Sequence, residues 1–271
     1  MPRPVLALLA AIVALAVPHL VSAQTTAPVI PVTVEETVGR PQGLFTEGLV
    51  FFGQRLFEST GLYGQSALHA FPASELGLPG GLGTEARLSL PPEVFGEGLA
   101  QAGGELFLLT WREGRVFVAD PGTLEIKRSY WQPIEGWGLA FDGRDLWRSD
   151  GTSLLQRHSV PDFSPVGPAV EVRDGQSPVG RLNELEWDPA QGLMLANIWH
   201  SDLVAAIDLV SGQVRYFLDL GPISAAERAD IGGQGAGEAV ANGLAIDAQG
   251  RLWATGKFWP RIYRLSFRAP R

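Results

Sequence analysis

Phe95-Gly96-Glu97-Gly98-Leu99 is followed, across Gly103-Gly104, by the apolar segment Leu106-Phe107-Leu108-Leu109-Thr110-Trp111. Two such segments separated by a Gly-Gly turn are typical of a β-hairpin. Both ends of a hairpin lie at one edge of its sheet, so we expect Glu97 and Trp111 to be neighbours. A carboxylate beside an indole face is a suitable place for chemistry on a cationic or amine substrate.

A related pattern recurs four more times along the chain. In each copy a leucine lies near the start of one predicted strand, and a second apolar segment follows it. The aligned leucines are Leu49, Leu99, Leu139, Leu185 and Leu244, so the copies are 40 to 59 residues apart. A hairpin-based repeat of this length is typical of a propeller blade of four strands. Five copies predict an all-β, five-bladed β-propeller, and the alternative is a plain antiparallel sandwich.

The two ends of the chain predict how the ring closes. The segment Val32–Val38 alternates apolar and polar residues, as a strand does, and it precedes the first copy. The last copy ends with Arg261–Phe267 and has no room for a fourth strand. We therefore expect the N-terminal strand to pair with the final blade, which removes two exposed sheet edges.

The second half of each blade is expected to be a further hairpin, and three other segments are expected to be irregular. Residues 24–31 are polar and contain proline, so we predict a flexible lead-in. Two insertions are longer than turns: residues 71–83, rich in Gly, Pro and Leu, and residues 221–241, in which a short helix can begin at Ser224. Loops of this length often cover a binding site.

The composition restricts the class of protein. The chain has 271 residues, 33 glycines, 20 prolines, no cysteine and a net charge of -8. The negative charge, without a basic stripe, argues against nucleic acid as a partner. Without cysteine, neither a disulfide nor a thiolate metal site can form.

The first residues predict export. Met-Pro-Arg-Pro is followed by an apolar run, Val5–Val17, and then by Val21-Ser22-Ala23 before Gln24. A basic start, an apolar run and a small-x-small end are typical of a secretory signal peptide. We predict a signal peptide over 1–23, a single propeller domain over 24–271, and a secreted or periplasmic protein that has no membrane segment after cleavage. The alternative is an uncleaved anchor.

A propeller brings the start of each first strand and the end of each second strand to one mouth of the central channel. In this chain those positions supply three tryptophans, two phenylalanines, two carboxylates, one amide and one lysine. The predicted rim residues are Phe45, Glu47, Phe95, Glu97, Trp111, Trp137, Asn183, Trp199 and Lys257.

The motifs resemble those of the plant-type glutaminyl-peptide cyclotransferases, over nearly all of the chain after residue 23. The matching motifs are Phe-Thr-Glu-Gly-Leu at 45, Glu-Ser-Thr-Gly-Leu-Tyr-Gly at 58, Phe-Gly-Glu-Gly-Leu at 95, Leu-Thr-Trp at 109, Gly-Trp-Gly-Leu at 136, Ser-Asp-Gly at 149, Leu-Asn-Glu-Leu-Glu at 182, Ala-Asn-Ile-Trp at 196 and Thr-Gly-Lys-Phe-Trp-Pro at 255. Each motif alone is weak, whereas all of them in order are specific.

The resemblance implies a five-bladed propeller that converts N-terminal glutamine of peptides or proteins to pyroglutamate, releases ammonia and uses neither a cofactor nor a metal. It implies that Glu97 is the catalytic carboxylate and that Asn183 and Lys257 are its polar partners. It implies an aromatic wall, which consists of Phe45, Phe95, Trp111, Trp137 and Trp199. Glu47 stands where the family usually has Gln, which affects the recognition of the substrate amide.

Structural roles are the alternatives for single residues. The rim tryptophans can be packing plugs, Glu97 can cap backbone N–H groups, and Lys257 can pair with Glu47 or Glu97. We expect Glu184 and Glu186 to lock blades together. The remaining tryptophans, at 131, 147, 187, 253 and 259, are expected in core or edge packing, and the histidines at 69, 158 and 200 at the surface.

Two other classes of protein remain open from the residues. One is a lactonase-type propeller hydrolase, in which Glu97, Asn183 and Asn242 hold a divalent cation. The other is a propeller that binds a sugar or peptide through its tryptophans without turnover. Dependence on a metal ion distinguishes the first class, and binding without turnover distinguishes the second.

Overall fold

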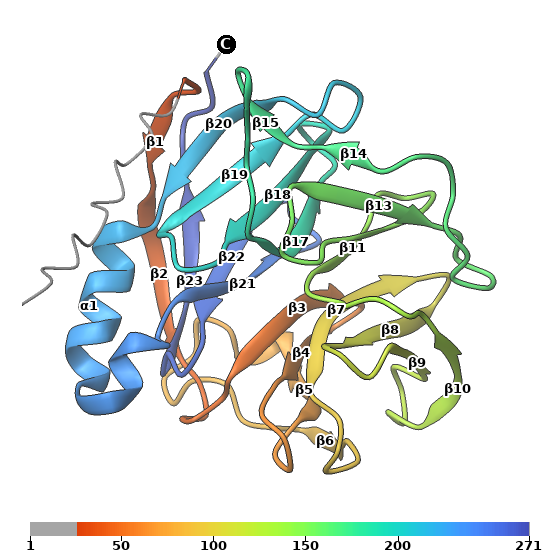
Figure 1. Ribbon diagram of the computed structural model, residues 1–271. Coiled ribbons are helices and arrows are strands. Elements are labelled where there is room, and N and C mark those ends of the chain that lie inside the picture. The colour runs from red at the N-terminus through yellow and green to blue at the C-terminus, as the bar shows by residue number, and fades with distance from the viewer. Residues whose placement is uncertain (1–25, 271) are drawn as a thin grey trace, which may run out of the picture.

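A computed structural model describes residues 26–270, and its sheets stand as five blades around a central channel (Figure 1). Blade I consists of β3 (Thr46–Phe52), β4 (Arg55–Thr60), β5 (Ala67–Pro72) and β6 (Ala86–Ser89). Blade II consists of β7 (Gly96–Ala102), β8 (Glu105–Thr110), β9 (Arg115–Ala119) and β10 (Ile126–Trp131). Blade III consists of β11 (Leu139–Phe141), β12 (Leu146–Arg148), β13 (Leu154–His158) and β14 (Val170–Glu171).

Blades IV and V each include a strand from the N-terminal end of the chain. Blade IV consists of β17 (Leu182–Asp188), β18 (Leu193–Ile198), β19 (Leu203–Ile207), β20 (Val214–Asp219) and β1 (Val29–Pro31). Blade V consists of β21 (Ala241–Ile246), β22 (Leu252–Gly256), β23 (Arg261–Ser266) and β2 (Thr33–Gly39). The short pair β15 (Arg173–Asp174) and β16 (Ser177–Pro178) links blades III and IV, and the helices are η1 (Ala73–Glu75), α1 (Gly221–Ile231) and η2 (Gly233–Gly237).

The ring closes as the sequence predicts. β2 pairs antiparallel with β23, with Val34 opposite Leu265 and Val38 opposite Ile262. The innermost strands β3, β7, β11, β17 and β21 pack each against the next, and β21 packs against β3. The five-bladed propeller and its closure by an N-terminal strand are therefore confirmed.

The lead-in is not flexible from residue 26 onward, contrary to the prediction. β1 runs parallel to β20, and the buried Asp174 carboxylate accepts hydrogen bonds from the backbone N–H groups of Thr26 and Ala27, both at 2.7 Å. A carboxylate that satisfies two backbone donors fixes this segment against blade IV. The predicted signal peptide over 1–23 and residue Gln24 lie outside the described residues.

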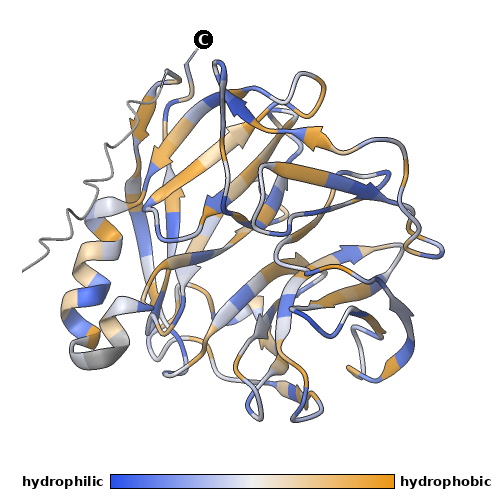
Figure 2. Cartoon of the chain, viewed as in Figure 1, coloured by the Kyte–Doolittle hydropathy of each residue, from blue (hydrophilic) through white to orange (hydrophobic). Residues whose placement is uncertain are grey.

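The aligned leucines explain why the repeat makes blades. Five apolar clusters fill the five interfaces between neighbouring blades, and each cluster contains one of these leucines. All five leucines are at most 1 % exposed. Burying one leucine side chain contributes about 1.5–3 kcal/mol, so one conserved type of contact stabilises each interface. Figure 2 shows that the blade strands carry most of the apolar residues.

The glycine before the aligned leucine allows neighbouring blades to approach each other. A Cβ atom at Gly98 would lie 2.6 Å from the backbone N of Leu139, and one at Gly138 would lie 2.0 Å from the backbone O of Asn183. Backbones this close leave no space for a side chain. Blade IV has Glu184 at this position, and its carboxylate accepts a hydrogen bond from the backbone N–H of Leu244 in blade V at 3.0 Å.

Several other predictions have mixed outcomes. The loop over residues 71–83 lies at the end of the blades remote from Phe45, where it lines a different hollow with Phe52 and Ile246. Helix α1 begins at Gly221 rather than at Ser224, because Pro222 suits the first turn of a helix.

The sequence predicts three histidines at the surface, and the structure confirms this for one of them. His200 is exposed, but His69 and His158 are buried, which contradicts the surface prediction. His158 stacks on Phe163, and burial lowers its pKa to about 4. A neutral imidazole can pack in an apolar interior, so these histidines belong to the core.

Candidate active site

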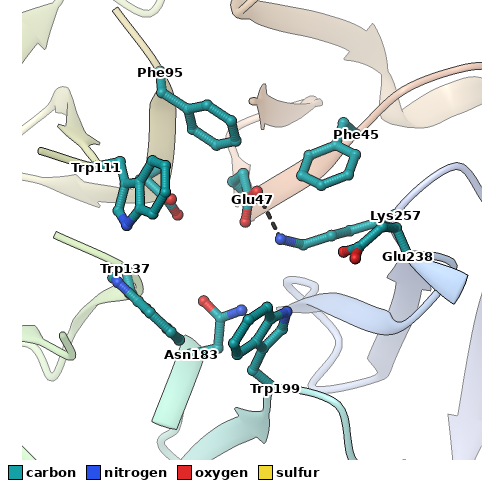
Figure 3. Close-up of a pocket in the computed structure, with 10 residues that line it drawn as sticks. Phe45, Glu47, Phe95, Trp111, Trp137, Asn183, Trp199, Glu238 and Lys257 are labelled. Atoms are coloured by element: carbon teal, nitrogen blue, oxygen red, sulfur yellow. Dashed lines mark hydrogen bonds and ion pairs between the residues drawn. The ribbon is translucent and has the colours of Figure 1, made fainter. Parts of the chain in front are cut away.

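One cavity of about 200 Å³ opens at the channel mouth (Figure 3). It brings together all nine rim residues predicted from the sequence and one more, Glu238. The lining residues are Phe45, Glu47, Phe95, Glu97, Trp111, Trp137, Asn183, Trp199, Glu238 and Lys257.

The repeat places these side chains by its local geometry. Residues two positions before the aligned leucines supply Glu47, Glu97, Trp137 and Asn183. In blades I, II and IV the pairing register of the first two strands shifts at this position, as at a β-bulge. A bulge redirects a side chain from the sheet face, here toward the channel. The ends of the second strands supply Trp111, Trp199 and Lys257.

Aromatic rings form most of the wall. The rings of Trp137 and Trp199 stand nearly perpendicular, at 86°, with centroids 5.5 Å apart, and Phe95 contacts Trp111 with the same centroid distance. Such walls confine a short aliphatic chain and leave its polar ends free to be bound.

The sequence reasoning missed Glu135, which holds two of the indoles. Its Oε2 atom accepts hydrogen bonds from the Nε1 atoms of Trp111 and Trp137, both at 3.1 Å. Partial burial raises the pKa of Glu135, but the hydrogen bonds from Trp137, Arg112 and Trp111 outweigh it and lower that pKa. Glu135 lies four residues before Leu139, as Phe95 does before Leu99, so the repeat offset was a usable signal.

Two carboxyl groups and one ammonium group lie at the base of the cavity. Glu47, Glu97 and Lys257 are 1 %, 5 % and 6 % exposed. Lys257 Nζ donates to Glu47 Oε1 at 2.7 Å, and Asn242 Nδ2 donates to Glu47 Oε2 at 3.0 Å. The predicted structural alternative for Lys257, an ion pair with Glu47, is thus present within the pocket.

Glu97 lies close enough to Glu47 for the negative charge of Glu47 to act on it. Two carboxylates buried this close to each other cannot both stay ionised, so one of the pair carries a proton. Burial and the negative charge of Glu47 raise the pKa of Glu97 well above its ordinary value. Burial also raises the pKa of Glu47, while Lys257 lowers it. We therefore place the proton on Glu97 and the charge on Glu47.

A buried arginine aligns the strands that carry this group. Arg40 Nη2 donates to Thr46 Oγ1 at 2.9 Å and to the backbone O of Gly256 at 2.8 Å. These residues immediately precede Glu47 and Lys257. Arg40 Nη1 pairs with Glu58 at 2.5 Å, and both side chains are buried. The network therefore fixes the start of β3 against the end of β22.

The predicted blade locks are present outside the cavity lining. Glu186 Oε1 accepts from the backbone N–H of Ile246 at 2.6 Å, as Glu184 does from Leu244. Burial raises the pKa of Glu186 to about 8. Over residues 26–270, no group of three or more His, Asp or Glu side chains is arranged to hold a metal ion.

Glu238 is the other pocket residue that sequence reasoning missed. It lies near the end of the insertion over residues 221–241, which we expected to cover a binding site, and its carboxylate lies at the mouth beside Lys257 (Figure 3). It is six residues before Leu244 and has no equivalent in the repeat, so only the length of the insertion indicated it.

Comparisons with known proteins identify similar chains. A family model described as glutamine cyclotransferase matches residues 6–267. A protein of Arabidopsis thaliana named glutaminyl-peptide cyclotransferase is 36 % identical over 227 residues, which are 83 % of this chain and 67 % of that protein. The crystal structure of Myxococcus xanthus glutaminyl cyclase superposes with a TM-score of 0.79 at 33 % identity and covers 90 % of this chain and 100 % of that one.

A more distant structure shares only the fold. A chain in a nidogen/laminin complex is 14 % identical, with a TM-score of 0.50, and the match covers 79 % of this chain and 73 % of that one. At this identity the likeness says nothing about function.

Proposed function

The chain belongs to the glutamine cyclotransferase family, and we propose that it converts N-terminal glutamine of peptides or proteins to pyroglutamate with release of ammonia. The observation that carries this proposal is the pocket itself. It combines an aromatic cage with a buried carboxyl pair, one member of which is protonated, beside Lys257 and Asn183.

The reaction is intramolecular, so positioning contributes much of the rate. The α-amine of glutamine attacks the carbonyl carbon of its own side chain and closes a five-membered ring. We propose that Trp111, Trp137 and Trp199 hold the side chain in a folded pose, with Phe45 and Phe95 completing the wall. Holding reacting atoms in such a pose removes much of the entropic barrier.

Glu97 is assigned to proton transfer. Its carboxyl group can donate a proton to the departing amide nitrogen while its second oxygen accepts the proton that the amine loses. The C–N bond to the side-chain amide breaks as the ring C–N bond forms, ammonia leaves, and Glu97 returns to its original state. General acid–base catalysis of this kind contributes about 10²–10⁴ in rate.

Lys257 and Asn183 are assigned to the carbonyl oxygen, which gains negative charge during the attack. The Lys257 ammonium group donates one hydrogen bond to Glu47 and has two further N–H groups to donate. Asn183 can donate from its amide N–H₂ group. The Oδ1 atom of Asn183 is buried without a donor among the described residues, so a substrate N–H can satisfy it. Both carboxylate oxygens of Glu47 already accept hydrogen bonds, from Lys257 and Asn242. We therefore assign Glu47 to raising the pKa of Glu97 rather than to binding the substrate amide.

The test is ammonia release from a peptide beginning with Gln, with an otherwise identical peptide beginning with Asn as the substrate control. Glu97→Gln keeps the shape of the side chain and removes its acid–base function, so we expect turnover to fall at least about 100-fold. Glu93→Gln, at a nearby exposed position, is the matched control and should retain full turnover. Near-normal turnover of Glu97→Gln would contradict the assignment.

A chelator distinguishes the proposed reaction from that of a metal-dependent hydrolase. We expect the chelator-treated wild-type protein to cyclise Gln peptides at the full rate. Loss of activity that a divalent ion restores would instead support the lactonase-type reading. Tight binding of the Gln peptide without ammonia release would indicate a propeller that only binds ligands.

We further propose that residues 1–23 are removed and that the protein acts outside the cytoplasm, as secreted or periplasmic. The basic start, the apolar run and the small residues before Gln24 support this. No helix of the described chain is long and apolar enough to cross a membrane. Intact-mass analysis of exported protein tests the proposal, with Gln24, partly blocked as pyroglutamate, as the expected N-terminus. An N-terminus elsewhere in active protein would contradict it.

A further inference from the structure

The charges inside the pocket balance one another, whereas one charge at its mouth does not. Glu47 and Lys257 form an ion pair, and Glu97, whose pKa burial raises well above its ordinary value, is the neutral member of the carboxyl pair. Glu238 is exposed. Among the described residues, no side chain donates a hydrogen bond to its carboxylate and none forms an ion pair with it. It is therefore the uncompensated charge of the pocket lining.

The backbone directly after Glu238 is held in place. Trp259 Nε1 donates to the backbone O of Ala239 at 3.2 Å, and the backbone N–H of Lys257 donates to the backbone O of Val240 at 2.9 Å. Ala239 is fully buried and Val240 is 5 % exposed. The insertion thus ends in an anchored segment, which keeps Glu238 at the mouth rather than free in solvent.

The proposed reaction decides which part of a substrate meets this carboxylate. The amine and the side-chain carbonyl carbon of glutamine must both lie near Glu97, because protons pass between them there. The rest of the bound peptide chain extends from the α-carbon of glutamine, and it must run out through the mouth of the pocket, away from Glu97. Figure 3 shows Glu238 on the side of the opening opposite Trp111, which belongs to the same blade as Glu97.

From this placement, and resting on the proposed function, we infer that Glu238 selects the residue that follows glutamine in the substrate. It favours a cationic residue, lysine or arginine, and disfavours an acidic one. Contact is not required, because charges act over about 10 Å at 0.1 M salt. A pair of unit charges about 4 Å apart in water changes an equilibrium about fivefold. Exchanging an acidic for a basic residue replaces repulsion with attraction, so at that separation it should change kcat/KM roughly 25-fold, and less at a longer one.

The experiment compares peptides of equal length that begin Gln-Lys, Gln-Ala and Gln-Glu. At low salt the wild-type protein should give the highest kcat/KM with Gln-Lys and the lowest with Gln-Glu. Glu238→Gln should bring the ratio between these two peptides close to one, and Glu238→Lys should reverse the order. High salt should flatten the wild-type ratio, because the screening length falls to about 3 Å at 1 M.

The control variant is Glu125→Gln, which removes an equal charge from a turn at the far end of blade II and should keep the wild-type ratio. An unchanged Gln-Lys to Gln-Glu ratio in both Glu238 variants would overturn the inference and leave the cyclisation intact. Absence of ammonia from all three peptides would instead contradict the proposed function, so the two failures are distinguishable.

Discussion

Replacing Gly138 with alanine should separate two blades and disturb the site at the same time. The new Cβ would lie 2.0 Å from the backbone O of Asn183 and 2.8 Å from its backbone C. Ordinary contact begins near about 3.4 Å, so the strands must move apart by roughly 1.4 Å. The Cβ atom is attached rigidly to the backbone and its contact partner is backbone, so neither can rotate away as the end of a long side chain can.

The magnitude follows from this rigidity. Overpacking costs about 1–3 kcal/mol, and a contact between two backbones belongs at the upper end of that range. In a domain of this size each kcal/mol lowers the melting temperature by about 2–4 °C, so we expect a fall of roughly 6–12 °C. Because Asn183 lines the pocket, a displacement of about 1 Å should also lower kcat, by up to about 100-fold.

The assay is thermal unfolding together with ammonia release from a Gln peptide. Gly180→Ala is the matched control, because a Cβ there has no atom within 4 Å. That substitution should leave stability unchanged or raise it by about 0.4–1 kcal/mol. A Gly138→Ala protein that melts like the wild type and turns over at the full rate would refute the close-approach reasoning.

Two further predictions concern the closure of the ring and the carboxyl pair. A protein that begins at Gly39 lacks β1 and all but the last residue of β2. Strands β20 and β23 then lose their N-terminal partners, so the melting transition should fall sharply or vanish; an unchanged transition would contradict closure by β2. Activity should rise with pH towards about 8, as the substrate amine loses its proton, and should fall again when Glu97 ionises. In Glu47→Gln the pKa of Glu97 should be lower, because the neighbouring negative charge is gone, so the basic limb of kcat/KM should move to lower pH. A basic limb that stays in place or moves upward would show that Glu47 does not raise the pKa of Glu97.

The sequence by itself determined the architecture and nine of the ten residues that line the pocket, because both repeat with the blade. Each aligned leucine fills an interface, and the residue two positions earlier points into the channel, so a fixed offset carries the information. Four of the nine predicted rim residues have this offset, two phenylalanines lie four positions before their leucines, and three residues end second strands; all nine line one pocket. The pairing of the N-terminal strand followed from counting strands at the two ends of the chain.

Only the tertiary structure decided what does not repeat. The protonation of Glu97 depends on Glu47, which lies in another blade, and on burial that no local pattern reveals. Asp174 fixes the N-terminal lead-in through contacts about 150 positions away in the chain. The position of Glu238 at the mouth depends on how an irregular insertion is anchored by Trp259. Long-range contacts of this kind arise from packing, so the spacing of residues along the chain does not predict them.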